Sequence, residues 1–194
     1  SGLKLDENAP LEERNFGGAA GDYIAGKVAL EKELRECAKA KNVVYTSIRP
    51  AFIYGPDNYA PREAIYFKWI LTAGQIIHPY NATGQFQMVF VLDVAKAILM
   101  CCMNEKAYNE SFNVCNENSL TYEEFAQVLE NAMELEFEKV ELSVEEVINK
   151  QIPLPFPLTY EESEWYDTSK IKKELGFVYT DIEKGMTITA NYYQ

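Results

Sequence analysis

The feature that most constrains the fold is a helix-like segment followed directly by a strand-like one. Residues 23–41 carry apolar side chains at helical spacing, with Glu and Lys between them, and we expect Asp22 to cap this helix and Asn42 to end it. Residues 43–48 (VVYTSI) are β-branched, apolar or half-polar, which is typical of a strand buried on both faces of a parallel sheet. Because a helix joined tightly to such a strand is half of a right-handed crossover unit, the pattern predicts an α/β fold.

A candidate ligand site follows this strand directly. Residues 49–56 (RPAFIYGP) come at its carboxyl end, which is where ligands bind in open α/β sheets. Two prolines and a glycine restrict the backbone there, and residues 57–62 add polar and aromatic groups. We therefore expect a substrate pocket at this end of the strand.

The remaining chain alternates helix-like and strand-like segments. We expect helices over 63–73, 94–103, 121–133, 170–175 and 182–192, strands over 75–77, 87–91, 111–115 and 137–142, and a short helix starting at Ser143. The strands 75–77 and 87–91 flank a predicted turn at 81–84, Gly74 and Gly176 end helices, and residues 151–159, with three prolines, are expected to be irregular.

A proton-transfer pair is suggested by Tyr23 and Lys27, which share one face of the predicted helix. A phenol beside an ammonium suits such a role, because the positive charge favours the phenolate. The spacing alone is weak, since the 13 tyrosines and 14 lysines of the chain give about one chance match. Tyr166 and Lys170 have the same spacing, so the context has to choose between the two pairs.

The composition and net charge limit the classes of partner that this chain can bind and indicate its cellular compartment. The 194 residues can form one domain or a large part of a two-lobed one, and the net charge of −12 argues against sequence-independent binding to nucleic acid or anionic lipid. The four cysteines form no C-x-x-C spacing, which predicts reduced, packed thiols in a cytoplasmic protein. The apolar run 97–103 is too short to span a bilayer. We expect no signal peptide at the start of the chain and no metal site at the lone His78.

Five short motifs occur in an order that resembles one enzyme family. They are Tyr23-x-x-x-Lys27, residues 47–56 (SIRPAFIYGP), residues 89–95 (VFVLDVA), residues 112–114 (FNV), and residues 167–170 (DTSK) with 174–177 (ELGF). Together they cover about 22–192 and resemble the C-terminal half of the NAD(P)-dependent epimerase/dehydratase family, the extended short-chain dehydrogenase/reductases. Within this family, the sequence of residues 49–61 resembles that of an atypical branch, which includes chloroplast stem-loop-binding proteins and their bacterial relatives.

This resemblance implies the fold class. It predicts an α/β fold made of the C-terminal half of a Rossmann-like parallel sheet plus a small α/β substrate-binding lobe, with the N-terminal nucleotide-binding half absent. We expect a loop over 1–21, the end of the Rossmann-like domain over 22–56, and mostly substrate-binding lobe with returning Rossmann elements over 57–194. The glycines in 17–21 follow no strand, so we expect no dinucleotide fingerprint there. The family's catalytic serine would also lie upstream, and the chain therefore resembles a fragment.

The resemblance also implies the site residues. Tyr23 would be the general acid/base, and Lys27 would hold the nicotinamide ribose and favour the phenolate. With these two, the expected contacts to the cofactor, NAD or NADP, are Pro50, Ala51, Phe52 and Ile53. The expected contacts to the substrate are Asn58, Arg62 and Gln87. Tyr166 and Lys170 would instead form a capped structural turn at the entry of a C-terminal helix.

Three functions remain open on these residues, and one of them is that the segment serves mainly as a substrate-binding and dimer-forming lobe. The other two are more specific. The first is an oxidoreductase-type enzyme that acts on a nucleotide sugar or a similar alcohol or carbonyl substrate, and it is compatible with a homodimer. The second is a non-catalytic protein on the same fold that senses a dinucleotide or binds RNA, against which the net charge of −12 speaks. The residues leave the substrate, the choice between NAD and NADP, and the choice between epimerase, dehydratase and reductase open.

Overall fold

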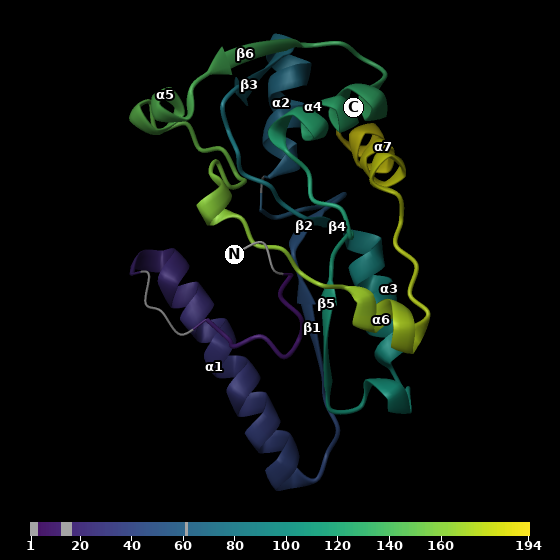
Figure 1. The fold of residues 1–194 in the computed structure, drawn as a ribbon. Coiled ribbons are helices and arrows are strands. Elements are labelled where there is room, and N and C mark those ends of the chain that lie inside the picture. The colour runs from purple at the N-terminus through teal and green to yellow at the C-terminus, as the bar shows by residue number, and fades with distance from the viewer. Residues whose placement is uncertain (1–3, 13–16, 61) are drawn as a thin grey trace.

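The computed structural model describes residues 4–12, 17–60 and 62–194. Strands and helices alternate along most of this chain (Figure 1). The helices are α1 Gly18–Lys41, α2 Glu63–Ala73, α3 Val91–Cys101, α4 Tyr122–Met133, α5 Val144–Asn149, α6 Ser169–Leu175 and α7 Ile182–Tyr193, with 3₁₀ turns η1 Glu105–Ala107 and η2 Tyr160–Glu162. The strands are β1 Thr46–Pro50, β2 Phe52–Tyr54, β3 Gln75–Pro79, β4 Met88–Phe90, β5 Glu110–Val114 and β6 Glu138–Leu142.

All strand pairs in the described ranges are parallel. β1 pairs with β5, β2 with β4, and β3 with β6. Each pair joins strands that are far apart in the sequence, as crossover connections through helices require. The α/β fold class with parallel strands is therefore confirmed.

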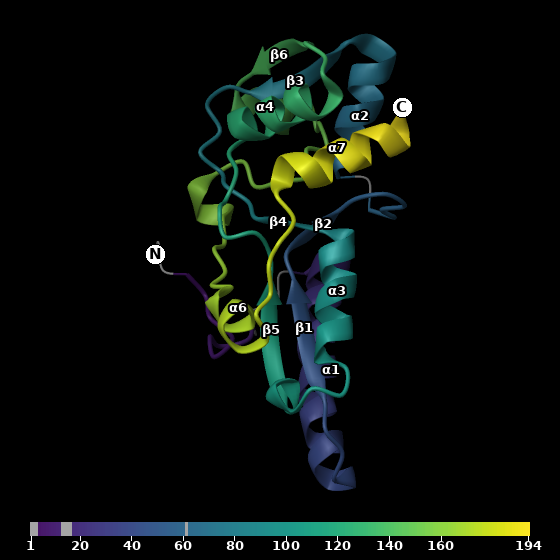
Figure 2. The same cartoon turned by 90° about the vertical axis from the view of Figure 1, so that its right-hand side faces the viewer.

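The elements form two lobes joined by β2 and β4 (Figures 1 and 2). In the first, which we call the β1–β5 lobe, α1, α3 and α6 lie around the β1–β5 pair. In the second, the α4–α7 lobe, α2, α4, α5 and α7 lie around β3 and β6. Because β1 runs directly into β2, the junction of the two lobes lies at the carboxyl end of β1.

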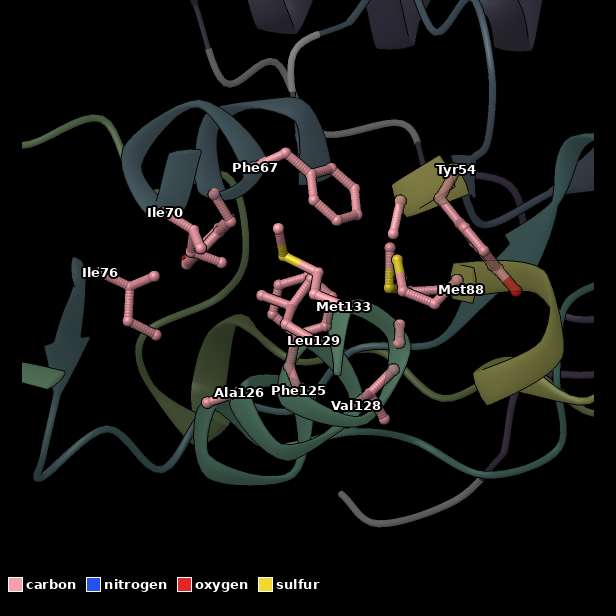
Figure 3. Packing of buried hydrophobic residues seen from close by; sticks show 14 of the residues in the cluster. Tyr54, Phe67, Ile70, Ile76, Met88, Phe125, Ala126, Val128, Leu129 and Met133 are labelled. Atoms are coloured by element: carbon pink, nitrogen blue, oxygen red, sulfur yellow. The ribbon is translucent and has the colours of Figure 1, made fainter. Parts of the chain in front are cut away.

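Each lobe has its own buried cluster. In the α4–α7 lobe, Phe67 and Ile70 of α2 converge on Leu129 and Met133 of α4 (Figure 3). In the β1–β5 lobe, Phe112 of β5 is buried with apolar residues of α3 and α6. Burying a side chain of this size stabilises the fold by about 1.5–3 kcal/mol, so these clusters fix both lobes.

The outer edge of β5 is covered by side chains. Glu7 accepts a hydrogen bond from the backbone N–H of Asn113 at 2.8 Å, and Lys170 donates to the carbonyl of Ser111 at 3.0 Å. Leu5 pairs with Tyr166 in an isolated parallel bridge, which holds the segment around Glu7 in place. The exposed row of backbone groups that an edge strand normally presents is thus partly satisfied.

Several predicted boundaries are confirmed. Asn42, Gly74 and Gly176 take the left-handed conformation at the ends of α1, α2 and α6. Capping boxes start α4 at Thr121 and α5 at Ser143. These signals are local, and the sequence shows them directly.

Three predictions near α1 are wrong. The helix begins at Gly18 rather than after Asp22, because Gly17 and Gly18, at φ 68° and 63°, make the turn into it. Of the loop predicted over 1–21, only residues 4–12 and 17 are therefore described as loop. The strand begins at Thr46, where pairing with β5 starts, so Val43 and Val44 remain exposed upstream of it. β1 is half-buried along most of its length rather than buried on both faces.

The expected turn at 81–84 does not join paired strands. β3 pairs with β6 in the α4–α7 lobe, whereas β4 pairs with β2 at the junction of the two lobes. The sequence shows a turn between two apolar runs, and such a turn is equally compatible with strands that pair elsewhere.

Candidate functional site

A groove of ≈ 380 Å³ lies at the junction of the two lobes. It brings together residues from the first turns of α1, the β1–β2 joint, the residue before α2, the run before β4, and the segment 157–166. Its lining includes six of the nine predicted site residues, namely Tyr23, Pro50, Ala51, Phe52, Arg62 and Gln87. The remaining three, Lys27, Ile53 and Asn58, are not part of this lining.

Tyr23 and Lys27 lie one turn apart on α1. Tyr23 is 60% exposed and lines the groove. The Lys27 Nζ lies 5.3 Å from the centroid of the Tyr23 ring, a cation–π distance. The pair thus combines an accessible phenol with an adjacent cation, as proton transfer requires.

The position of α1 depends on an ion pair with β1. Arg49 donates to both carboxylate oxygens of Glu31, from Nε at 3.0 Å and from Nη2, and its Nη1 donates to the Glu7 carbonyl at 3.1 Å. Arg35 donates to the same carboxylate at 2.7 Å. Burial alone would raise the pKa of Glu31, but the hydrogen bonds and charges of the two arginines outweigh it and hold the pKa below its usual range. Glu31 lies two turns after Tyr23, so this pair orients the tyrosine.

The β1–β2 joint forms one wall of the groove. Pro50, Ala51 and Phe52 line it, while Ile53 packs against the buried cluster of the β1–β5 lobe. The joint bends where Ala51 interrupts the two strands. Of the four residues 50–53 that were predicted to contact the cofactor, three therefore line the groove in this structure.

Beyond this joint, the chain passes close to α3. A Cβ on Gly55, which has a φ of 138°, would meet Val91 Cγ1 at 2.5 Å. Only glycine fits this backbone without displacement. The loop that leads to Arg62 is therefore fixed at its start.

Arg62 and Phe52 face each other in the groove. The Arg62 guanidinium carbon lies 5.3 Å from the centroid of the Phe52 ring. The ring itself packs edge-on against Phe156 at a centroid distance of 5.4 Å. Arg62, a lining residue of the groove, is thereby held against an aromatic surface.

Two predicted substrate contacts are engaged in local structure. Asn58 donates to the Ile53 carbonyl at 3.1 Å and to the buried carboxylate of Glu63 at 2.9 Å, and so it closes the loop before α2. Gln87 lies in the groove wall, but its carboxamide donates to the Asn116 carbonyl at 2.8 Å and accepts from the Tyr166 N–H at 2.6 Å. Both amides position neighbouring segments, and their role towards a substrate stays a prediction.

The segment 157–166 closes the groove and was not predicted to belong to it. It contributes Pro157, Glu162, Glu164 and Tyr166 to the lining. Its approach depends on Gly84, since a Cβ there would meet the Pro157 carbonyl oxygen at 2.0 Å. Only the Tyr166-x-x-x-Lys170 spacing drew attention to this segment in the sequence.

The two residues of the second Tyr/Lys pair, Tyr166 and Lys170, have different roles. Lys170 is structural, as expected, because its Nζ binds Glu110 at 2.6 Å on the edge of β5. Tyr166 instead lines the groove, with its hydroxyl hydrogen-bonded to the Glu164 carboxylate. Burial, followed by the hydrogen bond and charge of Glu164, raises the pKa of Tyr166 above its usual range.

Within 4–12, 17–60 and 62–194, no group of three or more His, Cys, Asp and Glu side chains is arranged to hold a metal ion. None of the helices described is both long and apolar enough to cross a membrane.

The arrangement defines a Rossmann-like α/β protein with a tyrosine and a lysine beside the carboxyl end of a parallel strand. Residues 4–115, more than half of the chain, match the NAD dependent epimerase/dehydratase family. The chain belongs to this family.

Individual proteins resemble this chain in sequence or in fold. The chloroplast stem-loop binding protein of 41 kDa b from Arabidopsis thaliana is 36% identical over 100 residues, which are 52% of this chain and 26% of that protein. The UDP-glucose 4-epimerase of Thermus thermophilus in complex with NAD has a similar fold, with a TM-score of 0.74, 19% identity, and coverage of 99% of this chain and 58% of that one. RMD from Pseudomonas aeruginosa, complexed with NADPH, gives a TM-score of 0.71 at 16% identity, over 98% of this chain and 60% of that one. The chain thus spans little more than half the length of these solved structures.

Proposed function

We propose that this chain carries the tyrosine side of an NAD(P)-dependent active site that acts on an alcohol or carbonyl group of a nucleotide sugar or a similar substrate. The observation that carries the proposal is the groove, in which Tyr23, residues 50–52 and Arg62 meet at the carboxyl end of β1. Membership of the epimerase/dehydratase family supports this class of reaction, as do structural neighbours that include a UDP-glucose 4-epimerase and an NADPH complex.

In this proposal Tyr23 is the general acid/base. Its phenol is 60% exposed and lines the groove, so it can reach a substrate hydroxyl or carbonyl without rearrangement. Lys27 supplies the positive charge that stabilises the phenolate formed during proton transfer, since its Nζ lies 5.3 Å from the ring centroid. The Glu31–Arg49 pair holds the helix that presents both groups.

The residues present fit one side of a nicotinamide cofactor. Pro50, Ala51 and Phe52 form a largely apolar wall beside Tyr23, which suits a flat ring. The Lys27 ammonium lies outside this lining but 5.3 Å from the Tyr23 ring centroid, and it would donate to ribose hydroxyls. When bound, the cofactor would accept a hydride from the substrate and return it. Among the residues that the structure describes, no glycine-rich strand–turn–helix is present to hold a pyrophosphate.

The test uses the protein in its full natural length. Tyr23→Phe should abolish turnover while NAD(H) binding, measured by calorimetry or by cofactor fluorescence, stays intact. Tyr80→Phe is the matched control, because Tyr80 is 59% exposed against 60% for Tyr23 and does not line the groove. Normal turnover by the Tyr23→Phe variant would refute the catalytic role.

The second candidate is RNA binding on the same fold. It is favoured by the 36% identity to a protein named as a chloroplast stem-loop binding protein. The net charge of −12 opposes it, because RNA binding needs clustered cations. A salt-sensitive mobility shift of a stem-loop RNA by the Tyr23→Phe variant would favour this second function.

A further inference from the structure

Three extended segments that connect the two lobes meet beside the groove. Residues 85–88 lead from the α4–α7 lobe into β4, residues 115–121 lead from β5 into α4, and residues 163–168 lead from η2 into α6 (Figure 1). The first and third of these segments contribute Gln87 and Tyr166 to the lining of the groove. The connections between the lobes therefore form part of its wall.

The side chain of Gln87 binds the backbone of both other segments. Gln87 is 2% exposed, and its Nε2 donates to the Asn116 carbonyl at 2.8 Å. The carbonyl oxygens of Glu117 and Tyr166 lie at longer distances from the same nitrogen, 3.4 and 3.3 Å. Its Oε1 accepts from the Tyr166 N–H at 2.6 Å. The carboxamide is therefore held in one orientation, with its nitrogen towards three carbonyl oxygens and its oxygen towards an N–H group.

The backbone of Gln87 extends this link to the wall beside Tyr23. Its carbonyl accepts from the Phe52 N–H at 3.3 Å, and the neighbouring Met88 carbonyl accepts from the Asn116 N–H at 2.9 Å. Phe52 follows the bend between β1 and β2 and lines the groove together with Tyr23. A displacement at this glutamine would therefore be passed both to the β1–β2 joint and to the segments that the amide binds.

The remaining contacts between the lobes leave their angle to be set at this point. β2 and β4 join the lobes, and their residues alternate between the two buried clusters. Each of these strands is only three residues long, so they act as a narrow connection. A buried amide with fixed partners beside such a connection resists rotation about it, because rotation would leave donors and acceptors without partners.

We propose that Gln87 is a positioning residue that sets the angle between the two lobes, and with it the width of the groove between Tyr23 and the segment 157–166. Its amide acts as a donor to one crossing segment and as an acceptor from another. The proposal rests on the proposed function in that the groove is taken as the active site, but the angle itself can be measured without a substrate.

The experiment measures the distance between the lobes in the full-length protein. Nitroxide labels are attached through p-acetylphenylalanine at Lys106 of η1, next to β5, and at Glu145 of α5, both of which are exposed. This ketone chemistry leaves the cysteines unlabelled. Pulsed electron paramagnetic resonance at about pH 8 and about pH 5 should give the parent one narrow distance distribution that is the same at both values.

Gln87→Glu should move the lobes at the higher pH only. The carboxylate has no donor for the Asn116 carbonyl and is repelled by it, so the mean distance at about pH 8 should shift by about 2 Å or more. Burial and the facing carbonyl oxygens raise the pKa of the new carboxyl, so its charge is lost as the pH falls through that raised pKa. The protonated carboxyl again offers one donor and one acceptor, and the distance at about pH 5 should return to that of the parent.

Gln85→Glu is the matched control. It adds the same charge to the same wall, since Gln85 also lines the groove two residues earlier. The Gln85 Oε1 accepts from the Ser119 hydroxyl at 2.7 Å and from Trp165 Nε1 at 3.4 Å, and a carboxylate keeps an acceptor for both. This variant should therefore keep the parent distance at both pH values.

Gln87→Met separates the lost hydrogen bonds from the added charge. Methionine has a similar length but neither a strong donor nor a charge, so the distance distribution should broaden equally at both pH values. Near-ultraviolet circular dichroism confirms that each variant is folded. If Gln87→Glu does not fold at the higher pH, the uncharged variant decides the question.

Three results would overturn the inference. They are a parent-like distribution in Gln87→Met, equal shifts in Gln87→Glu and Gln85→Glu, and a shift in Gln87→Glu that persists at about pH 5. Each can be told apart from a failure of the proposed function, which would appear as turnover by Tyr23→Phe or as absence of NAD(H) binding.

Discussion

The two Tyr-x-x-x-Lys segments of this chain have the same spacing and different surroundings. The side chains of Tyr23 and Lys27 make no hydrogen bond with any described residue, and the lysine lies 5.3 Å from the tyrosine ring. Tyr166 and Lys170 are anchored, the first to Glu164 and the second to Glu110 at 2.6 Å. Spacing on a helix decides which side chains share a face, but the neighbouring elements decide whether those side chains are available to a ligand.

The comparison also shows how an accessible pair is kept in place. α1 buries little of its own surface, and Glu31 ties it to Arg49 of β1 instead. α4, by contrast, is fixed by a row of buried apolar residues, Phe125 and Leu129 among them. The helix that presents the candidate catalytic groups therefore depends on a few polar contacts, whereas the helix that forms the core depends on apolar burial.

The largest expected effect is a loss of turnover when Lys27, the lysine of the accessible pair, is removed. Lys27→Ala should lower turnover of the full-length enzyme by about 100-fold or more, because it removes the charge beside the acid/base, while stability stays within about 0.5 kcal/mol. Lys39→Ala, in the last turn of the same helix, should leave turnover unchanged. Steady-state kinetics checks both, and equal losses in the two variants would contradict the role of Lys27.

Next in size is the loss of the contact that holds α1. Arg49→Ala should lower the free energy of unfolding by about 2–3 kcal/mol, because it leaves the Glu31 carboxylate, whose side chain is 13% exposed, without its main partner. Urea denaturation followed by circular dichroism measures this change. Arg35→Ala is the milder control, since the Arg35 side chain is 46% exposed. An Arg49→Ala protein as stable as the parent would show that α1 is held by other contacts.

A smaller loss is expected at the anchored pair. Lys170→Ala should cost about 1 kcal/mol of stability, because it removes one ion pair and one hydrogen bond at the β5 edge, and should change turnover less than Lys27→Ala does. Thermal denaturation and kinetics on the same samples give both values. If Lys170→Ala lowered turnover as much as Lys27→Ala, the distinction between the two pairs would fail.

The smallest effect is a pH dependence of stability at α1. The pKa of Glu31 is held below its usual value of 4.5 in the folded protein, so its contribution is fully present above that value and is lost as the pH falls through the folded pKa. Glu31→Gln should therefore show a flatter decline of stability below about pH 4.5 than the parent. Denaturation curves measured between about pH 3 and 6 test this, and parallel declines would exclude Glu31 as a contributor.

Much of the fold could be predicted because its signals are local. Asn42, Gly74 and Gly176 take the left-handed backbone expected at helix ends, and the capping boxes at Thr121 and Ser143 form as predicted. Strand partners could not be predicted, because pairing depends on segments far apart in the chain. The turn at 81–84 therefore looked like part of one strand–turn–strand unit, although it connects strands of different pairs.

The candidate site, like the fold, could be predicted only in part from the sequence. By itself, the sequence determined the motif order that shows the family, the helical spacing of Tyr23 and Lys27, and the loop at the carboxyl end of the following strand. Only the tertiary structure decided that the segment 157–166 closes the groove, that Asn58 is engaged with Glu63, and that Tyr166 lines the groove while Lys170 does not. The physical reason is that backbone propensities and caps act within a few residues, whereas a groove forms from side chains that packing brings together over the whole chain.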